Sequence, residues 1–281
     1  MATEHPSDAA PSPPAVEFEN VTFGFDDRVI LDDVSFTIPR GTMTIILGES
    51  GVGKSVTLKL ILGLLSPDGG IIRVNGERVD NMREQELIRV RSDIGMVFQE
   101  LALFDSLTVA ENVGYRLSEE MRWPDDQVQE RVEDVLGFIG LGEFIDRMPS
   151  ELSGGQRRRV AIARAVAPKP SLILFDDPTT GLDPIIASTV NDEIVKLRDL
   201  ERVTAIFVTQ QIRDAFYIAN HHAVRNDGGI EIIDTQDQGI SGTDFMLLHQ
   251  ARIHFRGTAA ELMASEDEYL REFLYMTLPP W

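Results

Sequence analysis

Hydrophobic residues along the chain fall into short runs that alternate with amphipathic stretches. The apolar runs at 42–47, 172–175 and 203–208 have the length of strands buried on both faces. Residues 183–197 instead carry apolar side chains every three or four positions, which predicts an amphipathic helix that begins at Asp183. This alternation predicts an α/β domain with a largely parallel sheet.

Further elements surround these runs. Residues 16–38 are strand-like, with turns predicted at Asp26-Asp27 and Asp32-Asp33. The pattern from about 101 to 167 is mostly helical, and Thr108 opens a capping-box pattern that starts one of its helices. Because this helical block interrupts the alternation, we expect it to form a subdomain.

The last third of the sequence predicts smaller elements. Residues 226–243 are polar and rich in Gly and Asp, which predicts a loop or an insertion. A hairpin at 245–255 follows, and short helices are predicted to begin at Thr258 and Asp267.

These patterns divide the chain into three parts. Residues 1–15 are rich in proline and lack both a basic start and an apolar run, so we expect a disordered tail rather than a secretory signal. The main domain covers 16–264, and a C-terminal extension covers 265–281. The apolar and aromatic residues of this extension are predicted to pack on their own domain, with docking on a partner as the alternative.

Charge and composition narrow the function classes. The chain has 281 residues with 26 Lys and Arg against 46 Asp and Glu, so its formal net charge is −20. This charge disfavours general nucleic-acid binding, which needs positive surfaces. The absence of cysteine excludes a disulfide scaffold, a thiolate metal site and a cysteine nucleophile. No stretch approaches the ~18 apolar residues of a membrane span, so we expect any membrane role to come through a partner.

Candidate chemistry begins directly after the strand predicted at 42–47. The following residues fit the pattern G-x-x-x-x-G-K-[ST], and they are Gly48, Glu49, Ser50, Gly51, Val52, Gly53, Lys54 and Ser55. In such a P-loop the backbone N–H groups surround phosphate oxygens, and the N-terminus of the next helix favours negative charge. Lys54 is then expected to reach the β- and γ-phosphates, and the Ser55 hydroxyl to bind Mg²⁺. The motif therefore predicts binding of ATP with Mg²⁺.

A second acidic position supports this interpretation. Asp176 ends the apolar strand predicted at 172–175, which is a Walker B pattern in which the carboxylate holds Mg²⁺ directly or through water.

The segment Leu152–Gln156 reads L-S-G-G-Q, with Ser153 standing 23 residues before Asp176. Here the sequence resembles the ABC-transporter ATPase family, whose signature is this string. The resemblance covers roughly residues 16–264. It implies a P-loop fold of the ABC type, with a mostly parallel sheet, an antiparallel β subdomain and the inserted helical subdomain at about 101–167.

The resemblance also implies roles for single residues. Gln99 matches the Q-loop residue, a ligand of Mg²⁺ or water, and Asp183 matches the D-loop residue that crosses to the partner subunit. Phe25 stands where the family places the aromatic ring that stacks on adenine, although Phe23 and Phe25 could simply share a strand face.

The family resemblance further implies a homodimer that forms when ATP is bound. In this family each ATP lies between one P-loop and the partner's signature segment. The signature residues implied to bind nucleotide in this way are Ser153, Gly154, Gly155 and Gln156.

Two positions depart from the family pattern. Asp177 stands where the family has a catalytic Glu, and Gln210 stands where it has a switch His. The Asp carboxylate is one methylene shorter, and Gln donates hydrogen bonds but cannot titrate. His221 and His222 lie too far along the predicted helix to replace the switch residue. We expect a working but slow ATPase, the alternative being an ATP-binding regulatory subunit with weak hydrolysis.

One segment indicates a particular transport system. Residues 98–109 resemble the A-L-F-D-S-L-T-V region of the ATPases of Mce/Mla-type phospholipid transporters, and residues 177–184 are also similar to them. In ABC proteins the first region borders the groove that receives the permease. The resemblance implies two permease subunits and Mce-domain lipid-binding proteins as partners, with the ATPase on the cytoplasmic face of the bacterial inner membrane.

Two other functions stay open. The chain could be an importer ATPase for another solute, because Leu101, Leu103 and Phe104 are apolar groove residues of a general kind. A soluble ABC ATPase acting on nucleic acid or ribosomes is disfavoured by the negative charge and the single cassette.

Overall fold

The computed structural model describes residues 12–226, 229–234 and 242–277. Most of the predicted N-terminal tail lies outside these ranges, as do parts of the polar stretch at 226–243 and the last four residues of the C-terminal extension.

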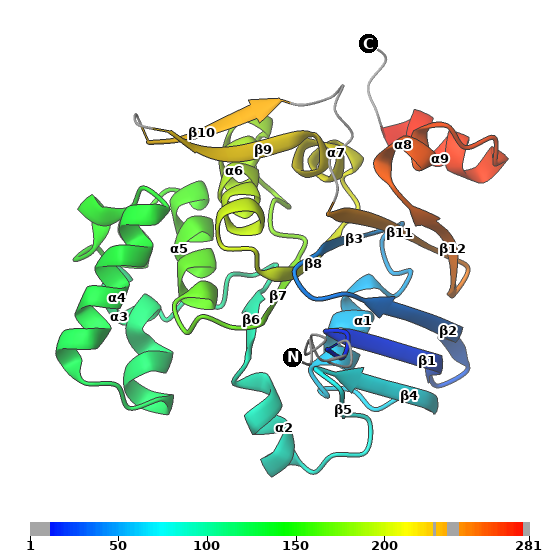
Figure 1. Cartoon of the computed structure of the whole chain (residues 1–281), viewed down its shortest axis with the longest axis horizontal. Coiled ribbons are helices and arrows are strands. Elements are labelled where there is room, and N and C mark those ends of the chain that lie inside the picture. Colours follow the sequence, from blue (N-terminus) through cyan, green and yellow to red (C-terminus); the bar gives the residue numbers. More distant parts are fainter. Residues whose placement is uncertain (1–11, 227–228, 235–241, 278–281) are drawn as a thin grey trace, which may run out of the picture.

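A six-stranded sheet runs through the centre of the molecule in the order β12-β11-β3-β8-β7-β6 (Figure 1). Its strands are β3 (Met43–Leu47), β6 (Ile94–Val97), β7 (Leu172–Asp176), β8 (Thr204–Thr209), β11 (Thr243–His249) and β12 (Arg252–Gly257). All neighbouring pairs are parallel except β11 and β12, which form the predicted hairpin. Every residue of β3 and β8 is buried, as expected for strands covered on both faces.

A second, antiparallel sheet has the order β2-β1-β4-β5. Its strands are β1 (Val16–Phe25), β2 (Arg28–Ile38), β4 (Gly69–Val74) and β5 (Glu77–Arg78). The turn predicted at Asp26-Asp27 is confirmed, but the turn predicted at Asp32-Asp33 is wrong. These two residues lie inside β2, where Asp33 has a φ of 53° next to a shift in the pairing with β1. Aspartate tolerates the left-handed conformation in bulges as well as in turns, so the residue type alone does not separate the two.

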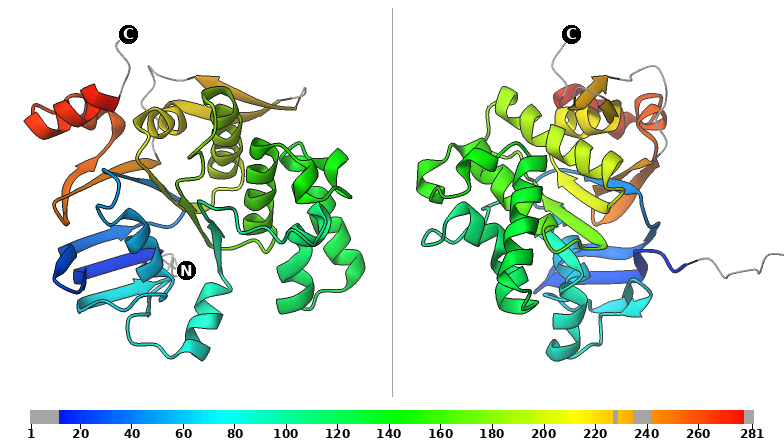
Figure 2. Two further views of the ribbon diagram at one scale, coloured as in Figure 1. Left: turned by 180° about the vertical axis from the view of Figure 1, so that it is seen from behind. Right: turned by 60° about the vertical axis from the view of Figure 1, so that its left-hand side comes forward.

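The helices cover both faces of the central sheet, and those from α3 to α5 form a block at one side (Figures 1 and 2). They are α1 (Lys54–Ile61), α2 (Glu84–Arg91), α3 (Val109–Tyr115), the π-helical η1 (Arg116–Glu120), α4 (Asp125–Phe138), the 3₁₀ turns η2 (Gly142–Phe144) and η3 (Pro149–Glu151), α5 (Gly154–Val166), α6 (Pro184–Leu200), α7 (Ile212–Asn220), α8 (Ala259–Met263) and α9 (Glu268–Thr277). The helix starts predicted at Thr108, Asp183 and Thr258 are confirmed. Each of these residues is an N-cap whose side chain accepts hydrogen bonds from backbone N–H groups of the first helical turn. Within the described residues, no helix is long and apolar enough to cross a bilayer.

The central sheet separates two hydrophobic cores. On one face, Ile45 and Leu47 of β3 pack in a cluster with residues of α3 to α7. On the other face, Ile46 belongs to a cluster that includes α1 and the antiparallel sheet. Adjacent β3 residues face opposite cores because side chains alternate along a strand.

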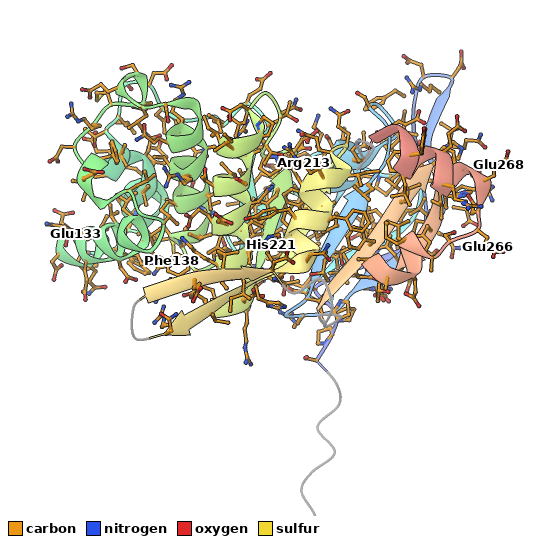
Figure 3. The ribbon with its side chains drawn as sticks, turned by 90° about the horizontal axis from the view of Figure 1, so that it is seen from above. Glu133, Phe138, Arg213, His221, Glu266 and Glu268 are labelled. Carbon is orange, nitrogen blue, oxygen red and sulfur yellow. The ribbon has the colours of Figure 1, made fainter. Side chains whose placement is uncertain are left out.

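A ribbon of two strands, β9 (His221–Asn226) and β10 (Gly229–Asp234), packs against α6 (Figures 1 and 3). Residues 229–234 thus form a strand rather than the loop predicted as one alternative for 226–243, and the other alternative, an insertion, stays a prediction. His221 and His222 begin β9 rather than lying along a helix.

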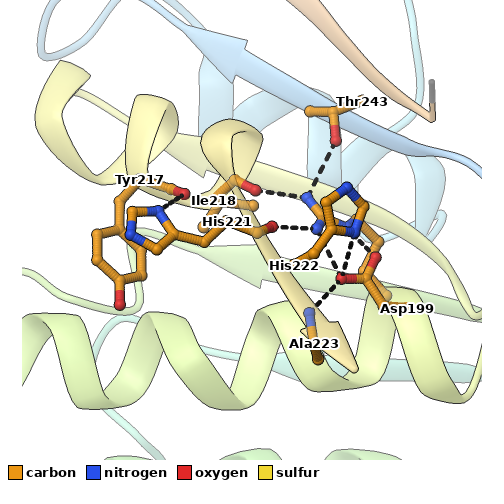
Figure 4. A network of polar contacts seen from close by, with 8 residues as sticks. Asp199, Tyr217, Ile218, His221, His222, Ala223 and Thr243 are labelled. Carbon is orange, nitrogen blue, oxygen red and sulfur yellow. Dashed lines mark hydrogen bonds and ion pairs between the residues drawn. The ribbon is translucent and has the colours of Figure 1, made fainter. Parts of the chain in front are cut away.

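Arg198 of α6 contacts the point where α7 turns into β9. Figure 4 shows the residues around this point, with Ile218, His221 and Thr243 labelled. The Arg198 guanidinium donates to the backbone carbonyls of Ile218 and His221 and, at 3.3 Å, to the Thr243 hydroxyl. The neighbouring Asp199 carboxylate accepts from Arg198 and from the Ala223 backbone N–H. These contacts tie the end of α7 and the start of β9 to α6.

The C-terminal extension packs on its own domain, as predicted. Leu270, Phe273 and Leu274 of α9 are buried in the core that lies on the α5–α7 face of the sheet.

Candidate nucleotide site

The P-loop joins the end of β3 to the start of α1. Gly48 has a φ of 151°, and a Cβ atom there would lie 2.7 Å from the Leu248 carbonyl oxygen and 2.8 Å from the Val52 side chain. Gly53 caps α1 in a left-handed conformation with a φ of 115°. The loop therefore needs glycine at both positions.

Lys54 lies folded against this loop. Its Nζ donates to the Gly48 carbonyl at 2.7 Å and to the Glu49 carbonyl at 2.8 Å, and only 7% of the residue is exposed. Burial lowers the pKa of the Lys54 ammonium below its usual value. Three nearby carboxylates oppose this shift, and they belong to Asp177, Asp176 and Glu49. The positive charge thus lies among acidic groups at the loop where phosphate is predicted to bind.

Ser55 and Asp176 lie together although they are far apart in the sequence. The Ser55 hydroxyl donates to Asp176 Oδ1 at 2.7 Å. Burial raises the pKa of Asp176, and the hydrogen bond from Ser55 acts in the opposite direction. A hydroxyl and a carboxylate in contact are oxygen donors of the kind Mg²⁺ prefers.

The two departures from the family pattern lie beside this pair. Asp177 is buried, with a φ of 48°, and its Oδ1 accepts from the Thr209 hydroxyl at 3.1 Å. Gln210 is exposed and lines a cavity together with the first P-loop residues. Strands β7 and β8 are adjacent and parallel, so their carboxyl ends bring Asp176, Asp177 and Gln210 to one edge of the sheet.

The signature residues form the start of α5. The Ser153 hydroxyl accepts from the Gln156 N–H at 3.3 Å, and the Gln156 side chain accepts from the Ser153 N–H at 2.8 Å. A Cβ atom on Gly155 would overlap the Ile186 side chain, whereas one on Gly154 would lie in ordinary contact with Leu182, at 3.5 Å. Within one chain, the signature therefore packs against the predicted D-loop and the start of α6.

Gln99 is exposed two residues after the end of β6, and its carbonyl accepts a hydrogen bond from Arg158. Arg158 Nη1 donates to the Gln99 and Phe98 carbonyls at 2.7 and 3.2 Å, and Nη2 donates to the Thr180 carbonyl at 3.2 Å. Sequence reasoning missed this role, because Arg158 stands in a run of three arginines and nothing local marks it as buried.

Phe25 lies on the hairpin next to the P-loop. It is half exposed, and its ring meets that of Phe23 edge-on, with centroids 4.9 Å apart. Its pairing partner Arg28 reaches the Gly51 carbonyl at 3.4 Å. The hairpin thus brings an exposed aromatic ring close to the loop.

Two further residues missed from the sequence shape the segment 98–109. Asn112 is buried, and its side-chain Oδ1 accepts a hydrogen bond from the Phe104 N–H. Its Nδ2 is a donor within 3.0 Å of the Phe104, Leu107 and Thr108 carbonyl oxygens. Arg164 donates to the Leu101 and Ala102 carbonyls, both residues having positive φ. A groove of about 400 Å³ lies beside this segment. Its lining combines apolar residues such as Phe98 and Phe104 with charged ones such as Arg116 and Arg164.

The site and fold together define a P-loop nucleotide-binding protein, because a glycine-rich loop joins a buried parallel strand to a helix. A sequence profile described as ABC transporter matches residues 31–180, more than half of the chain. The chain therefore belongs to the ABC transporter family.

Two relatives differ in the substrate that their names give. The "Intermembrane phospholipid transport system ATP-binding protein MlaF" of Escherichia coli K12 is 36% identical over 259 residues, covering 92% of this chain and 88% of that protein. The "Fe(3+) ions import ATP-binding protein FbpC" of Photorhabdus laumondii is 38% identical over 220 residues, covering 78% of this chain. The match spans only 61% of the length of that iron-import protein.

Solved structures of ATP-binding cassettes have the same fold as this chain. The dimeric ATP-binding cassette MJ0796 bound to ADP and Pi has a TM-score of 0.70 and 28% identity, covering 86% of this chain and 98% of that one. The cbiO1 protein from Clostridium perfringens has a TM-score of 0.75 and 27% identity, covering 95% and 96%. These matches confirm the predicted ABC fold and the ATPase class, and the dimeric neighbour supports a homodimer.

We expect Lys54→Ala to abolish ATP binding, because the phosphates lose the positive charge that the P-loop holds in place. Isothermal titration with MgATP checks this. Lys59→Ala is the matched control, since it removes the same charge from an exposed position of the same helix. An affinity of the Lys54 variant within a few-fold of wild type would contradict the P-loop assignment.

Proposed function

We propose that this chain is the ATPase subunit of an Mce/Mla-type transporter that moves phospholipid across the cell envelope. The observation that carries the proposal is the extent of the match to MlaF, which covers 92% of this chain and 88% of the E. coli protein. The iron-import relatives are slightly more identical but contain a large part that this chain does not match. Their identity still favours a second candidate, an importer ATPase for another solute.

ATP binding in this proposal uses the residues predicted from the sequence. Residues 48–55 surround the phosphates, Lys54 contacts the β- and γ-phosphates, and Phe25 stacks on adenine. In the homodimer, the partner's Ser153, Gly154, Gly155 and Gln156 complete the site, and Asp183 crosses the interface.

Magnesium fits the donors that the structure brings together. Ser55 and Asp176 supply a hydroxyl and a carboxylate 2.7 Å apart, and Gln99 is the third proposed ligand. The remaining ligands of Mg²⁺ are proposed to come from phosphate and water. When bound, Mg²⁺ supplies charge neutralisation at the β- and γ-phosphates.

Hydrolysis is assigned to Asp177 and Gln210. Asp177 orients the attacking water as general base, and the Thr209 hydroxyl holds its carboxylate in place. Gln210 donates a neutral hydrogen bond to the γ-phosphate, which is weaker than the charge-assisted bond from a protonated histidine.

The groove beside residues 98–109 is proposed to receive a permease subunit, which places the ATPase on the cytoplasmic face of the bacterial inner membrane. Two permease subunits and Mce-domain proteins complete the transporter. The test is to purify the native complex through this chain and identify its contents by mass spectrometry. Phospholipid with an Mce-domain protein is expected, and a periplasmic solute-binding protein without lipid would reject the proposal.

We expect Phe104→Asp to release the permease while the isolated chain still binds ATP, because a charge placed in an apolar interface loses its hydration. Phe104 is the better target because its side chain is partly exposed beside the groove, whereas Leu103 packs against the core. Co-purification measures the loss. Met263→Asp introduces the same charge at an exposed apolar position of α8 and should leave the complex intact.

We expect Asp177→Glu and Gln210→His each to raise kcat, and the double variant to raise it further without additivity, because both groups act on one water and one phosphate. A well-placed general base contributes about 10²–10⁴-fold in rate, and Asp177 is expected to keep part of it. The measurement is steady-state turnover of wild type and the three variants at saturating MgATP. Flat or lower kcat in both single variants would show that the site is built around Asp and Gln.

A further inference from the structure

A cavity of about 550 Å³ lies between the P-loop and the C-terminal helix α9. The first three P-loop residues and Gln210 form one wall, and Tyr269, Glu272 and Phe273 of α9 form the other. The C-terminal extension therefore reaches the side of the P-loop where Gln210 is proposed to meet the γ-phosphate.

Tyr269 is held firmly in this wall. Its ring stacks on His249 of the β11–β12 hairpin, with centroids 3.6 Å apart, and meets the edge of His254 at 5.2 Å. His254 Nε2 lies 3.1 Å from Asp267, whose carboxylate also accepts from the Leu270 N–H at the start of α9. These contacts set the ring position independently of its hydroxyl.

The Tyr269 hydroxyl points to the P-loop and donates to Glu49 Oε1 at 3.4 Å. Burial and the nearby Glu49 carboxylate raise the pKa of Tyr269 to about 12. An ordinary tyrosine hydroxyl is already protonated at neutral pH, so this group remains a donor there.

Glu49 is an acidic residue within the P-loop, which is the predicted phosphate-binding loop. Its carbonyl accepts from Lys54 Nζ, and its carboxylate is close enough to act on the pKa of Lys54. A Glu49 carboxylate free to rotate toward Lys54 would compete with phosphate for the ammonium and repel the incoming phosphates.

We propose that Tyr269 is a positioning residue that holds the Glu49 carboxylate away from the phosphate position, so that α9 tunes the affinity for ATP. The inference rests on the proposed role of the P-loop as the ATP site. It assigns to the C-terminal extension a part in nucleotide binding.

Tyr269→Phe tests this, because the ring and its stacking remain while the hydroxyl is lost. We expect the Kd for MgATP to rise about 3- to 10-fold, the range of one partly exposed hydrogen bond, with kcat at saturation changed less than about twofold. The effect on MgADP should be smaller, because Gln210 and the cavity lie on the proposed γ-phosphate side. The melting temperature of the variant checks that α9 stays in place.

A second substitution separates positioning from structure. In a Glu49→Gln background, Tyr269→Phe should have no effect on the Kd, since no carboxylate remains to be held. In a Glu272→Gln background the defect should persist, because this change removes an equal charge from the same cavity without touching the contact.

Each result decides the inference. A Tyr269→Phe variant that binds MgATP like wild type overturns it, as does a defect that Glu49→Gln leaves in place. A wild-type chain that binds no ATP would overturn the proposed ATP site itself, which is a separate failure.

Discussion

The buried guanidinium of Arg158 joins three segments on which the site depends. A cation taken out of water is costly unless it is hydrogen-bonded. Here the two terminal nitrogens of the guanidinium donate to the carbonyls of Phe98, Gln99 and Thr180, whereas Nε is buried without a hydrogen-bond partner in the described part of the chain. Burial accordingly lowers the pKa of Arg158. Arg158 lies in α5, the helix that starts at the signature. Its hydrogen bonds join α5 to the segment that contains Gln99 and to the turn after Asp177. A displacement of any one of them strains the hydrogen bonds of the other two.

Several elements of the fold and the site can be predicted from residues that are close together in the sequence. Buried strands at β3, β7 and β8 follow from uninterrupted apolar runs, and the helix starts at Thr108 and Asp183 follow from side chains that cap their own backbone. The P-loop is equally local, since its glycines, Lys54 and Ser55 are consecutive. The contact between Ser55 and Asp176 was implied by two separate motifs, and the structure shows them joined by a hydrogen bond.

The parts that escaped prediction depend on residues far apart in the chain. Asn112 and Arg158 are polar residues whose burial is set by packing, and no pattern of neighbours reveals which carbonyls they will reach. Tyr269 lies 220 positions from Glu49, and its aromatic surroundings indicated only that the extension would pack somewhere. The strand β10 was missed although Ile230 and Ile232 alternate with Glu231 and pack against the core. The Gly and Asp residues around this short run predicted a loop instead.

The place of β11 in the sheet has a consequence for biosynthesis. Met43 of β3 pairs with Thr243 of β11, so one edge of the strand that leads into the P-loop stays open until 200 further residues have been made. Unpaired edges and exposed apolar surface invite association between nascent chains. Contacts this distant in sequence also slow folding. The central sheet of this ATPase therefore closes around β3 only after β11 has been made.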